Sequence, residues 1–519
     1  MTALSPAPRP PRMHRTMRPA RRTSPRTAWI VLALALVLLA GLIVGCSANP
    51  VTGKQQINFY SEAQEIALGK QADRDMVAQL GLVDDEELTR YVQALGLSMA
   101  ENSERPSLPW TFRVIDDPMV NAFALPGGYV YITRGLLSYL GSEAELAGVL
   151  GHEIGHVTAR HSVNRLSKAQ LAQTGLLVAT VAVAVSADDS RDRAYAGLGL
   201  LAANVGTQLA FLKFSRDDER QADALGFRYM RAIGQPPEAL SQVFDTLQEV
   251  SLATRGGTGP PPWLSTHPEL GNRRVANETR FADAGLAPSD DWGFTPYRQQ
   301  IDGLVFGVNP RQGFVADGRF IHPDLGFQFD VPDGWRVQNE RARVIVANDE
   351  GNAGLILTLA EADDPRAALN AFGAQESVTL GDDRWLRSRR LTSRLVRIKG
   401  DQSQGALPGG VAFVEHSGQI IQMLGIGTNE GLWKRHDPTL ERAVASFGRL
   451  REARLRNIQP QRIEVIPLRR AQSLRAFNSA RPSSVELDVL ARVNQVEPDA
   501  VLPAGTLIKR IVGDGVPDA

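Results

Sequence analysis

Between residues 49 and 297, hydrophobic and polar residues alternate mainly with the spacing that is typical of helices. One region differs, because Phe112–Ile115 and Tyr129–Ile132 are short runs of β-branched and aromatic residues joined through Leu125-Pro-Gly-Gly. Such runs, bounded by Pro and Gly, predict strands. We therefore expect a mainly α domain with a small β-sheet over residues 46–300.

Two Ala-, Val- and Leu-rich runs, at residues 171–187 and 194–212, interrupt this helical pattern. Each is nearly long enough for a membrane span, but polar residues such as Gln173 and Asn204 fall inside them. We interpret the two runs as a helical hairpin packed in the core of the domain.

Alternating hydrophobic and polar positions begin near residue 310 and predict an α+β module at residues 310–450. Strands are predicted at Leu325–Val331, Arg343–Val346, Val411–Val414 and Gln419–Met423, and an amphipathic helix at Thr439–Leu450. The last two strands are expected to form a hairpin. The module loosely resembles small sandwich modules of the photosystem-P/Mog type.

The last segment, residues 460–513, has the order strand, helix, helix, strand. The strands are predicted at Ile463–Ile466 and Leu502–Gly505, and the helices near Ser473 and at Leu490–Asn494. This order resembles a LysM fold, with Ala471-Gln-Ser in place of the Gly-Asp-Thr turn of that fold. The resemblance implies a small LysM-like domain that could contact peptidoglycan.

Composition narrows the class of protein. The 519 residues carry 57 basic and 57 acidic side chains, so no net charge attracts the chain to nucleic acid. A hydrophobic content of 43% excludes a mainly disordered chain. The single cysteine excludes a disulfide framework and a multi-cysteine metal site. Of the eight histidines, three lie within ten residues of one another.

The N-terminus has the layout of an export signal. Seven arginines between residues 9 and 26 precede an uncharged apolar run at residues 28–44, which ends at Ile43-Val-Gly-Cys46. These four residues resemble a bacterial lipobox, which implies a signal peptide at residues 1–45 and an acylated Cys46 anchored in a lipid bilayer. Ser47 is typical of export to the outer membrane. The alternative is an uncleaved anchor.

The strongest chemical motif is His152-Glu-Ile-Gly-His156, on a helix that begins at Ser142. Two histidines four residues apart project from one helix face and can bind one zinc ion. Glu153, between them, is positioned to take a proton from the attacking water as general base. Gly151 and Gly155 weaken the helix, so we expect another element to approach closely there.

A catalytic zinc site takes a third protein ligand and keeps a fourth position open. Residues 216–223 supply candidates, since Glu219 and Asp223 are four apart on a helix. One carboxylate can bind the metal while the other accepts the second N–H of a ligand histidine. The spacing does not choose between Glu219 and its neighbours Asp217 and Asp218.

Several motifs together resemble the BepA/HtpX/Oma-type zinc metallopeptidases, which are gluzincins. They are Asn49-Pro-Val-Thr-Gly-Lys54, Asn121-Ala-Phe-Ala-Leu-Pro-Gly-Gly128, His152–His156 with His161, Ser215–Asp223, and Ser265-Thr-His267-Pro with Arg273. The resemblance implies that Glu219 is the third ligand and Asp223 its supporting carboxylate. It also implies that Asn121, Ala122, Phe123 and Tyr129 bind substrate. His161 is five residues past His156 and should point off the zinc face, so we interpret it as structural or as supporting a ligand. The members that resemble BepA carry helical repeats downstream, which this chain replaces with the module and the LysM-like domain.

These features predict a lipid-anchored zinc endopeptidase on the periplasmic side of the bacterial envelope, acting on misfolded or stalled envelope proteins. The Tyr129–Ile132 strand is expected to hold an extended peptide by edge pairing. The alternative is an envelope scaffold or chaperone that mainly binds clients. The intact set of His152, Glu153, His156 and Glu219 favours the enzyme.

His267 has two predicted roles, one that inhibits catalysis and one that assists it. Its neutral imidazole could fill the open position of the zinc and hold the enzyme inactive. It could instead stabilise the oxyanion, with Arg273 adding positive charge. We favour self-inhibition, because His267 follows the Gly- and Pro-rich residues 255–262.

Overall fold

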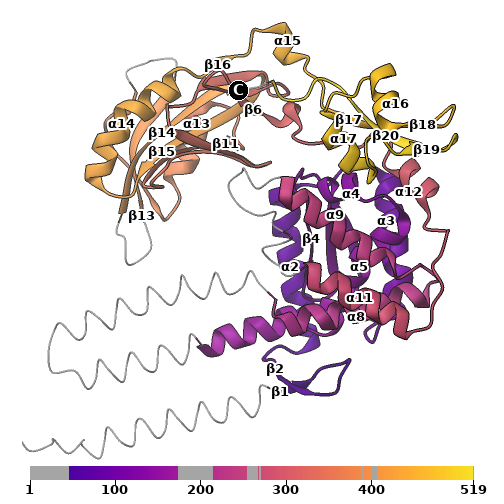
Figure 1. Ribbon diagram of the computed structural model, residues 1–519. Helices are drawn as coiled ribbons and strands as arrows, with labels where there is room; N and C mark the ends of the chain where they lie inside the picture. The colour runs from indigo at the N-terminus through magenta and orange to yellow at the C-terminus, as the bar shows by residue number, and fades with distance from the viewer. Residues whose placement is uncertain are drawn as a thin grey trace, which may run out of the picture.

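The computed structural model describes residues 46–172, 214–253, 263, 267, 270–386, 391–399 and 406–517. The predicted signal peptide and most of the predicted helical hairpin lie outside these ranges. Within them the chain forms a helical domain (residues 46–306), the α+β module (307–460) and a C-terminal tail (461–517) (Figure 1). No helix in the described ranges has both the length and the apolar character needed to cross a membrane.

The helical domain is built around one small sheet. Its helices are α2 (Glu62–Leu80), α3 (Glu86–Ala100), α4 (Arg134–Tyr139), α5 (Glu143–Thr158), α8 (Arg216–Ala232), α9 (Ala239–Ala253), α11 (Leu270–Asp283) and α12 (Phe294–Gln300). Its strands are β1 (Cys46–Ala48), β2 (Gln55–Ile57), β3 (Thr111–Ile115), β4 (Ala122–Leu125) and β5 (Tyr129–Thr133). β1 and β2 form a separate antiparallel pair.

The sheet corrects one prediction about the site. Its strand order is β3-β5-β4, with β5 parallel to β3 and antiparallel to β4. The Tyr129–Ile132 strand is therefore central, and its backbone groups are already paired on both sides. The two edge strands are β3 and β4, and β4 lies within the Asn121–Gly128 motif and not in either of the predicted strands. Gly127 and Gly128 close the β4–β5 turn with positive φ angles of 81° and 101°.

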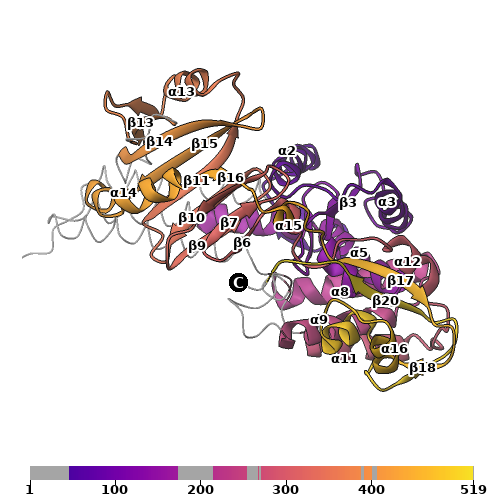
Figure 2. The same ribbon diagram turned by 90° about the horizontal axis from the view of Figure 1, so that it is seen from above.

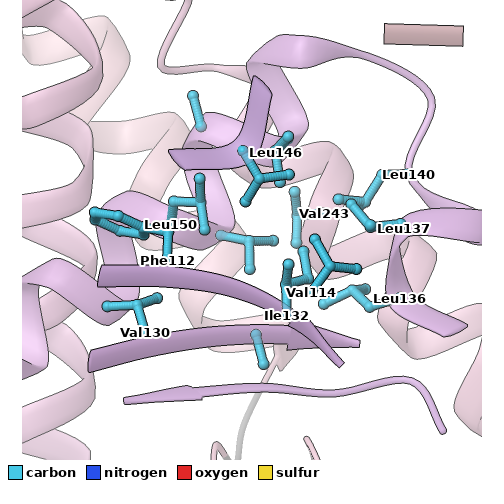
Figure 3. Close-up of a cluster of buried hydrophobic side chains, with 14 of the residues drawn as sticks. Phe112, Val114, Val130, Ile132, Leu136, Leu137, Leu140, Leu146, Leu150 and Val243 are labelled. Carbon is cyan, nitrogen blue, oxygen red and sulfur yellow. The ribbon is translucent and has the colours of Figure 1, made fainter. Parts of the chain in front are cut away.

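The core of the helical domain lies between the sheet and the helices. Figure 3 shows Val114 and Ile132 of the sheet facing Leu146 and Leu150 of α5, with Val243 of α9 beside them. All five side chains are buried. This packing holds α5 against the sheet, so that the helix and the strands form one rigid unit.

The α+β module contains a seven-stranded antiparallel sheet in the order β12-β13-β14-β15-β11-β10-β9 and a four-stranded one in the order β16-β8-β7-β6 (Figure 2). Its strands are β6 (Phe314–Ala316), β7 (Arg319–His322), β8 (Phe327–Asp330), β9 (Trp335–Asn339), β10 (Arg343–Asn348), β11 (Ala353–Ala360), β12 (Val378–Leu380), β13 (Thr392–Lys399), β14 (Ala406–His416), β15 (Gln419–Gly427) and β16 (Gly448–Arg449). Its helices are η1 (Pro310–Gln312), α13 (Pro365–Gly373), α14 (Glu430–Ala445) and α15 (Ala453–Arg456).

The predicted β14–β15 hairpin is confirmed, whereas the helix predicted at Thr439–Leu450 is displaced. It begins at Glu430, where the Asn429 side chain accepts a hydrogen bond from the Leu432 N–H, and it continues through Pro438 to Ala445. Burial of Trp433 in the module core explains the early start, because its packing outweighs the helix-breaking effect of a proline.

The tail contains the predicted strand, two helices and strand in that order, with two further strands of two residues each, β18 and β19. Its elements are β17 (Arg462–Pro467), β18 (Gln472–Ser473), α16 (Leu474–Ala480), α17 (Leu487–Asn494), β19 (Val501–Leu502) and β20 (Leu507–Val512). The last long strand begins at Leu507 and not at Leu502, because Pro503 to Thr506 form a turn with Gly505 at φ 89°. β20 pairs with β17 in antiparallel fashion. The LysM assignment stays a prediction.

Candidate metal centre

Helix α5 begins where the sequence predicted. The Ser142 hydroxyl accepts a hydrogen bond from the Glu145 N–H at 3.2 Å. The Glu145 carboxylate does not complete the expected capping box, since it accepts from the Gly141 N–H at 3.0 Å and not from the Ser142 N–H. A carboxylate in the first turn still favours the helix through its dipole.

Two glycines let α8 lie against α5. A Cβ atom at Gly155 would stand 3.0 Å from Cα of Ala222, and one at Gly151 would stand 3.1 Å from Cα of Gly226. The close approach predicted from these glycines is therefore confirmed. It brings Glu219, on α8, to the histidines of α5.

Four side chains converge at this crossing: His152, His156, Glu219 and His267. Their donor atoms all lie within 4.8 Å of one another, and each side chain is buried. His152 Nε2 is 3.0 Å from His156 Nε2 and 3.2 Å from His267 Nδ1. Glu219 Oε1 is 3.0 Å from His267 Nδ1 and 3.5 Å from His156 Nε2.

These separations fit a zinc ion. Tetrahedral bonds of about 2.0–2.1 Å place the donor atoms about 3.3–3.4 Å apart. Imidazole nitrogen and carboxylate oxygen are also ligand types that zinc prefers. The sequence analysis left Asp217 and Asp218 open as third ligands, but of these carboxylates only Glu219 joins the group.

Asp223 and Arg273 support the ligands from behind. His152 Nδ1 lies 2.9 Å from Asp223 Oδ1, so an N–H there donates to the carboxylate and directs the Nε2 lone pair into the site. Arg273, on α11, donates to both Asp223 oxygens at 2.7 and 2.9 Å and lies 2.9 Å from Glu219. The guanidinium is thus held by two carboxylates. Its predicted contribution to an oxyanion site stays a prediction.

Burial and charge set the protonation states of the centre. Burial and the Arg273 cation lower the pKa of His152 to about 3, so its ring is neutral at pH 7. Burial would raise the pKa of Asp223, but Arg273 and the His152 N–H hold it at about 2. Burial raises the pKa of Glu153 to about 7. A neutral histidine beside an ionised carboxylate is the pair that a divalent metal ion needs.

Glu153 lies beside the four donor atoms without joining them. Its Oε1 is buried and has no hydrogen-bond partner among the described residues, and it is 3.7 Å from His267 Nε2. A carboxyl oxygen buried without a partner is unfavourable in a site that only stabilises the fold. The arrangement suits a group that exchanges a proton with a bound molecule.

Aromatic residues that the sequence analysis did not identify surround the histidines. The Phe214 ring stacks on His156 at 3.9 Å between centroids, and Trp263 stacks on His267 at 4.2 Å. His161 lies off the metal face, as predicted, with its Nδ1 2.9 Å from His156 Nδ1. The tertiary fold brings Phe214 to His156, whereas Trp263 lies four residues before His267 and reaches it through a local contact that the spacing could have indicated.

Three of the four residues predicted to bind substrate lie at or next to the edge strand β4, and the fourth, Tyr129, lies on the central strand β5. Ala122 and Phe123 belong to β4, which packs against α5, and Asn121 immediately precedes it. The buried Asn121 Oδ1 has no hydrogen-bond partner among the described residues. Tyr129 is the first residue of the central strand β5 and pairs with Leu125.

Residues 86–279 match the family model described as Peptidase family M48. The chain is 33% identical over 290 residues to the beta-barrel assembly-enhancing protease of Yersinia pestis, covering 55% of this chain and 56% of that protein. It is 30% identical over 261 residues to the protein of that name from Escherichia coli (strain K12), covering 48% and 51%. It is 31% identical over 242 residues to the mitochondrial metalloendopeptidase OMA1 of Bos taurus, covering 44% and 43%.

The chain thus spans about half the length of these curated relatives. Among solved structures, cyanobacterial PsbP (CyanoP) from Synechocystis sp. PCC 6803 is 15% identical and has a TM-score of 0.21, covering 26% of this chain and 96% of that chain.

Proposed function

We propose that the chain is a zinc-dependent endopeptidase of the bacterial cell envelope, because residues 86–279 match the family model described as Peptidase family M48. The observation that carries the proposal is the juxtaposition of four metal-binding donor atoms with the unpartnered Glu153 carboxyl. A site for structural zinc needs four ligands and no such carboxyl group.

His152, His156 and Glu219 are proposed to hold the zinc ion, with Asp223 fixing the tautomer of His152. A bound zinc ion would polarise the scissile carbonyl and acidify the attacking water. Glu153 then takes the proton of that water and delivers it to the leaving amine.

The substrate is proposed to bind as an extended peptide along β4. An edge strand offers unpaired N–H and C=O groups to a peptide, and β4 packs against the helix that carries Glu153. Asn121, with its buried and unpartnered side-chain oxygen, supplies a further acceptor at the start of this strand.

His267 is proposed to inhibit the site in the absence of substrate. Its Nδ1 lies with the donor atoms of the three ligands, at the position where a catalytic zinc site keeps a place for water or substrate. The His267 ring stacks on Trp263, and the backbone N–H of His267 donates to the backbone carbonyl of Trp263 at 2.7 Å. Both contacts favour this position.

The finer parts of the proposal rest on the sequence and the relatives. We expect an acylated Cys46 to anchor the chain, and misfolded or stalled envelope proteins to be the substrates. The assignment is consistent with relatives named for beta-barrel assembly. The domain division at 46–300, 310–450 and 460–513 is part of the same proposal.

Glu153→Gln tests the mechanism. Glu153 is not a proposed ligand, so the variant should keep its zinc and lose about 10²–10⁴-fold of casein cleavage. Comparing envelope proteins that accumulate with the variant and with the native protein would identify substrates. Normal cleavage by the variant would refute the mechanism. Equal accumulation with both forms would favour the scaffold alternative.

A further inference from the structure

The segment that joins α4 to α5 is held by side chains from the C-terminal tail. Lys509 Nζ donates to the backbone carbonyls of Ser138 and Leu140 at 2.9 and 2.8 Å. Gln495 Nε2 donates to the carbonyl of Tyr139, which lies between them, at 2.9 Å. Three successive carbonyls at the end of α4 are therefore satisfied by residues more than 350 positions away in the sequence.

Gln495 also reaches the first turn of the metal-binding helix. Its Nε2 also lies 2.7 Å from the Glu145 carboxylate and 3.0 Å from the Thr246 hydroxyl on α9, so the two N–H groups of the amide are shared among three acceptors. Glu145 is fully buried. Loss of the Gln495 amide would leave buried acceptors on three helices short of a donor, which is unfavourable.

The backbone of Gln495 is strained in a way that its side chain explains. The residue ends α17 in the left-handed conformation, with φ 57° and ψ 41°. Glycine is the usual residue there, and other residues are less stable by about 1 kcal/mol. The glutamine at this position indicates that the stabilisation from its side-chain contacts exceeds the energy of the backbone strain.

The segment that these residues hold sets the relation between the two halves of the site. Strand β5 runs directly into α4, whose N-terminal cap is Thr133, and the segment at residues 138–141 leads into α5. The sheet carries the edge strand β4, while α5 carries His152, Glu153 and His156. Figure 3 shows Leu137 and Leu140 packed beside Leu146 of α5 at this joint.

The tail is itself bound firmly to the helical domain. Ile463, Val493 and Ile511 belong to the same buried cluster as the side chains of α5. The backbone of Ile463 pairs with Gly303 and Leu304 at 2.8 and 2.9 Å. Because the tail is firmly attached, its side chains can hold the α4–α5 joint in one position.

We propose that Gln495 and Lys509 are positioning residues of the peptidase site, which set the placement of α5 relative to the substrate strand β4. The proposal rests on the proposed function, because the groups that it positions are those of the proposed site. It also assigns the tail a role in the peptidase reaction itself, in addition to any ligand that the tail binds.

The test compares full-length Gln495→Ala and Lys509→Met with Arg475→Ala. Arg475 is a matched control, since it lies in the same tail and forms an exposed ion pair with Asp499. Amide hydrogen exchange over residues 138–150, zinc content and kcat for casein are measured at 25 °C, together with the melting temperature. We expect exchange over residues 138–150 to accelerate about tenfold and kcat per zinc-bound molecule to fall about tenfold in the two variants. The control should match the native protein.

Each result has a definite meaning. A lower melting temperature with native exchange and native kcat would overturn the proposal, because the tail would then only stabilise the fold. Equal behaviour of all three variants would also overturn it. If the native protein cleaves no substrate, the proposed function fails, while the exchange data still decide whether Gln495 and Lys509 hold the joint.

Discussion

At the scale of single residues, the metal centre combines groups that would repel one another in isolation. The lone pairs of His152, His156 and Glu219 converge over 3.0–3.6 Å in a site from which solvent is excluded. A divalent cation compensates such converging lone pairs, and the ionised Asp223 and Arg273 pair behind them keeps the ligands in place. The chemistry of the centre is thus set by residues on three helices.

His267→Ala should raise basal cleavage of casein several-fold. The substitution leaves three proposed protein ligands, which is the number that catalytic zinc sites use. Zinc content should stay near one ion per chain. His436→Ala, a histidine in the α+β module, serves as the control. A fall in turnover with unchanged zinc would instead assign His267 to transition-state stabilisation.

His322 should make the stability of the α+β module depend on pH. Burial lowers the pKa of His322 to about 4, whereas an unfolded histidine titrates near 6.5. Between these values the unfolded chain binds a proton that the folded chain does not, so stability falls as the pH falls from about 6.5 to about 4. The Leu325 N–H donates to His322 Nδ1 at 3.2 Å, and protonation removes that acceptor.

His322→Asn tests this dependence, because the asparagine oxygen can accept the same hydrogen bond and does not titrate. We expect equal melting temperatures at pH 7.5. At pH 4.5 the variant should be more stable than the native module by about 1–2 kcal/mol, after allowance for partial solvent screening. Parallel pH profiles for the two proteins would show that His322 is not responsible.

The sequence predicted the ligands on α5 because a spacing of four residues decides which side chains share a helix face. Spacing alone left the third ligand open, while the family resemblance implied Glu219, and the structure shows what separates the candidates. Asp218 accepts from the Ser215 N–H at 3.0 Å and so completes the helix cap, while Asp217 pairs with Arg220. Phe214 was not predicted, since no spacing relates it to the histidines of α5, whereas the four-residue spacing from Trp263 to His267 is a signal that the sequence did contain.

At the scale of elements, local patterns located most individual strands and the start of α5, but not the start of α14 or the order of the strands in a sheet. Ser142 and the apolar stripe after it predicted the start of α5 correctly. Strand order cannot be predicted in this way, because the sequence of a strand does not indicate which other strand it pairs with. The hydrophobic pattern therefore identified Tyr129–Ile132 as a strand but placed it at the edge, and residues 122–125 of β4 were indicated only by the family resemblance of the Asn121–Gly128 motif.

Gly155→Ala should weaken both the fold and metal binding. The new Cβ would lie 3.0 Å from Cα and O of Ala222, and backbone atoms cannot rotate away. Overpacking of this kind typically destabilises by about 1–3 kcal/mol, which exceeds the gain of about 1 kcal/mol in helix propensity. Because α8 carries Glu219, its displacement should also lower zinc affinity about tenfold.

Gly148→Ala is the matched control on the same helix. Its new Cβ would meet Leu240 Cδ1 at 3.3 Å, and a leucine methyl group can move aside. This variant should be at least as stable as the native protein and bind zinc equally well. If the two alanine variants melt at the same temperature and lose zinc equally to a chelator, the close packing at Gly155 is not important for stability or for zinc binding.

At the scale of the whole molecule, the two chain segments that connect the α+β module to the rest of the protein lie side by side. The Phe306 N–H donates to the Gln461 carbonyl at 2.8 Å, and Val305 bridges to Arg462 in antiparallel fashion. The module is therefore inserted between two segments that pair with each other. The sequence showed the change of pattern near residue 310, but not that the tail returns to the helical domain, since such contacts leave no periodic signal.

This arrangement predicts that the module can be removed without loss of the metal centre. In a chain that lacks residues 308–459, Gly307 would be joined to Pro460 by about four Gly and Ser residues, a length common in hairpin loops. Gly307 should be kept, because its carbonyl accepts from Arg134 at 2.7 Å. We expect this chain to fold cooperatively and to bind zinc with native affinity.

A chain that ends at Gln459 should behave in the opposite way, although it loses fewer residues. It would lack Ile463, Val493 and Ile511 of the shared core, and the joint at residues 138–141 would lose Gln495 and Lys509. We expect low solubility and little bound zinc, measured by metal analysis after gel filtration. The outcome that would contradict the insertion is the reverse order, in which the chain without the tail binds zinc and the chain without the module does not. The domain that carries the metal centre would then depend on the α+β module, and the pairing of residues 303–306 with the tail would be incidental to its stability.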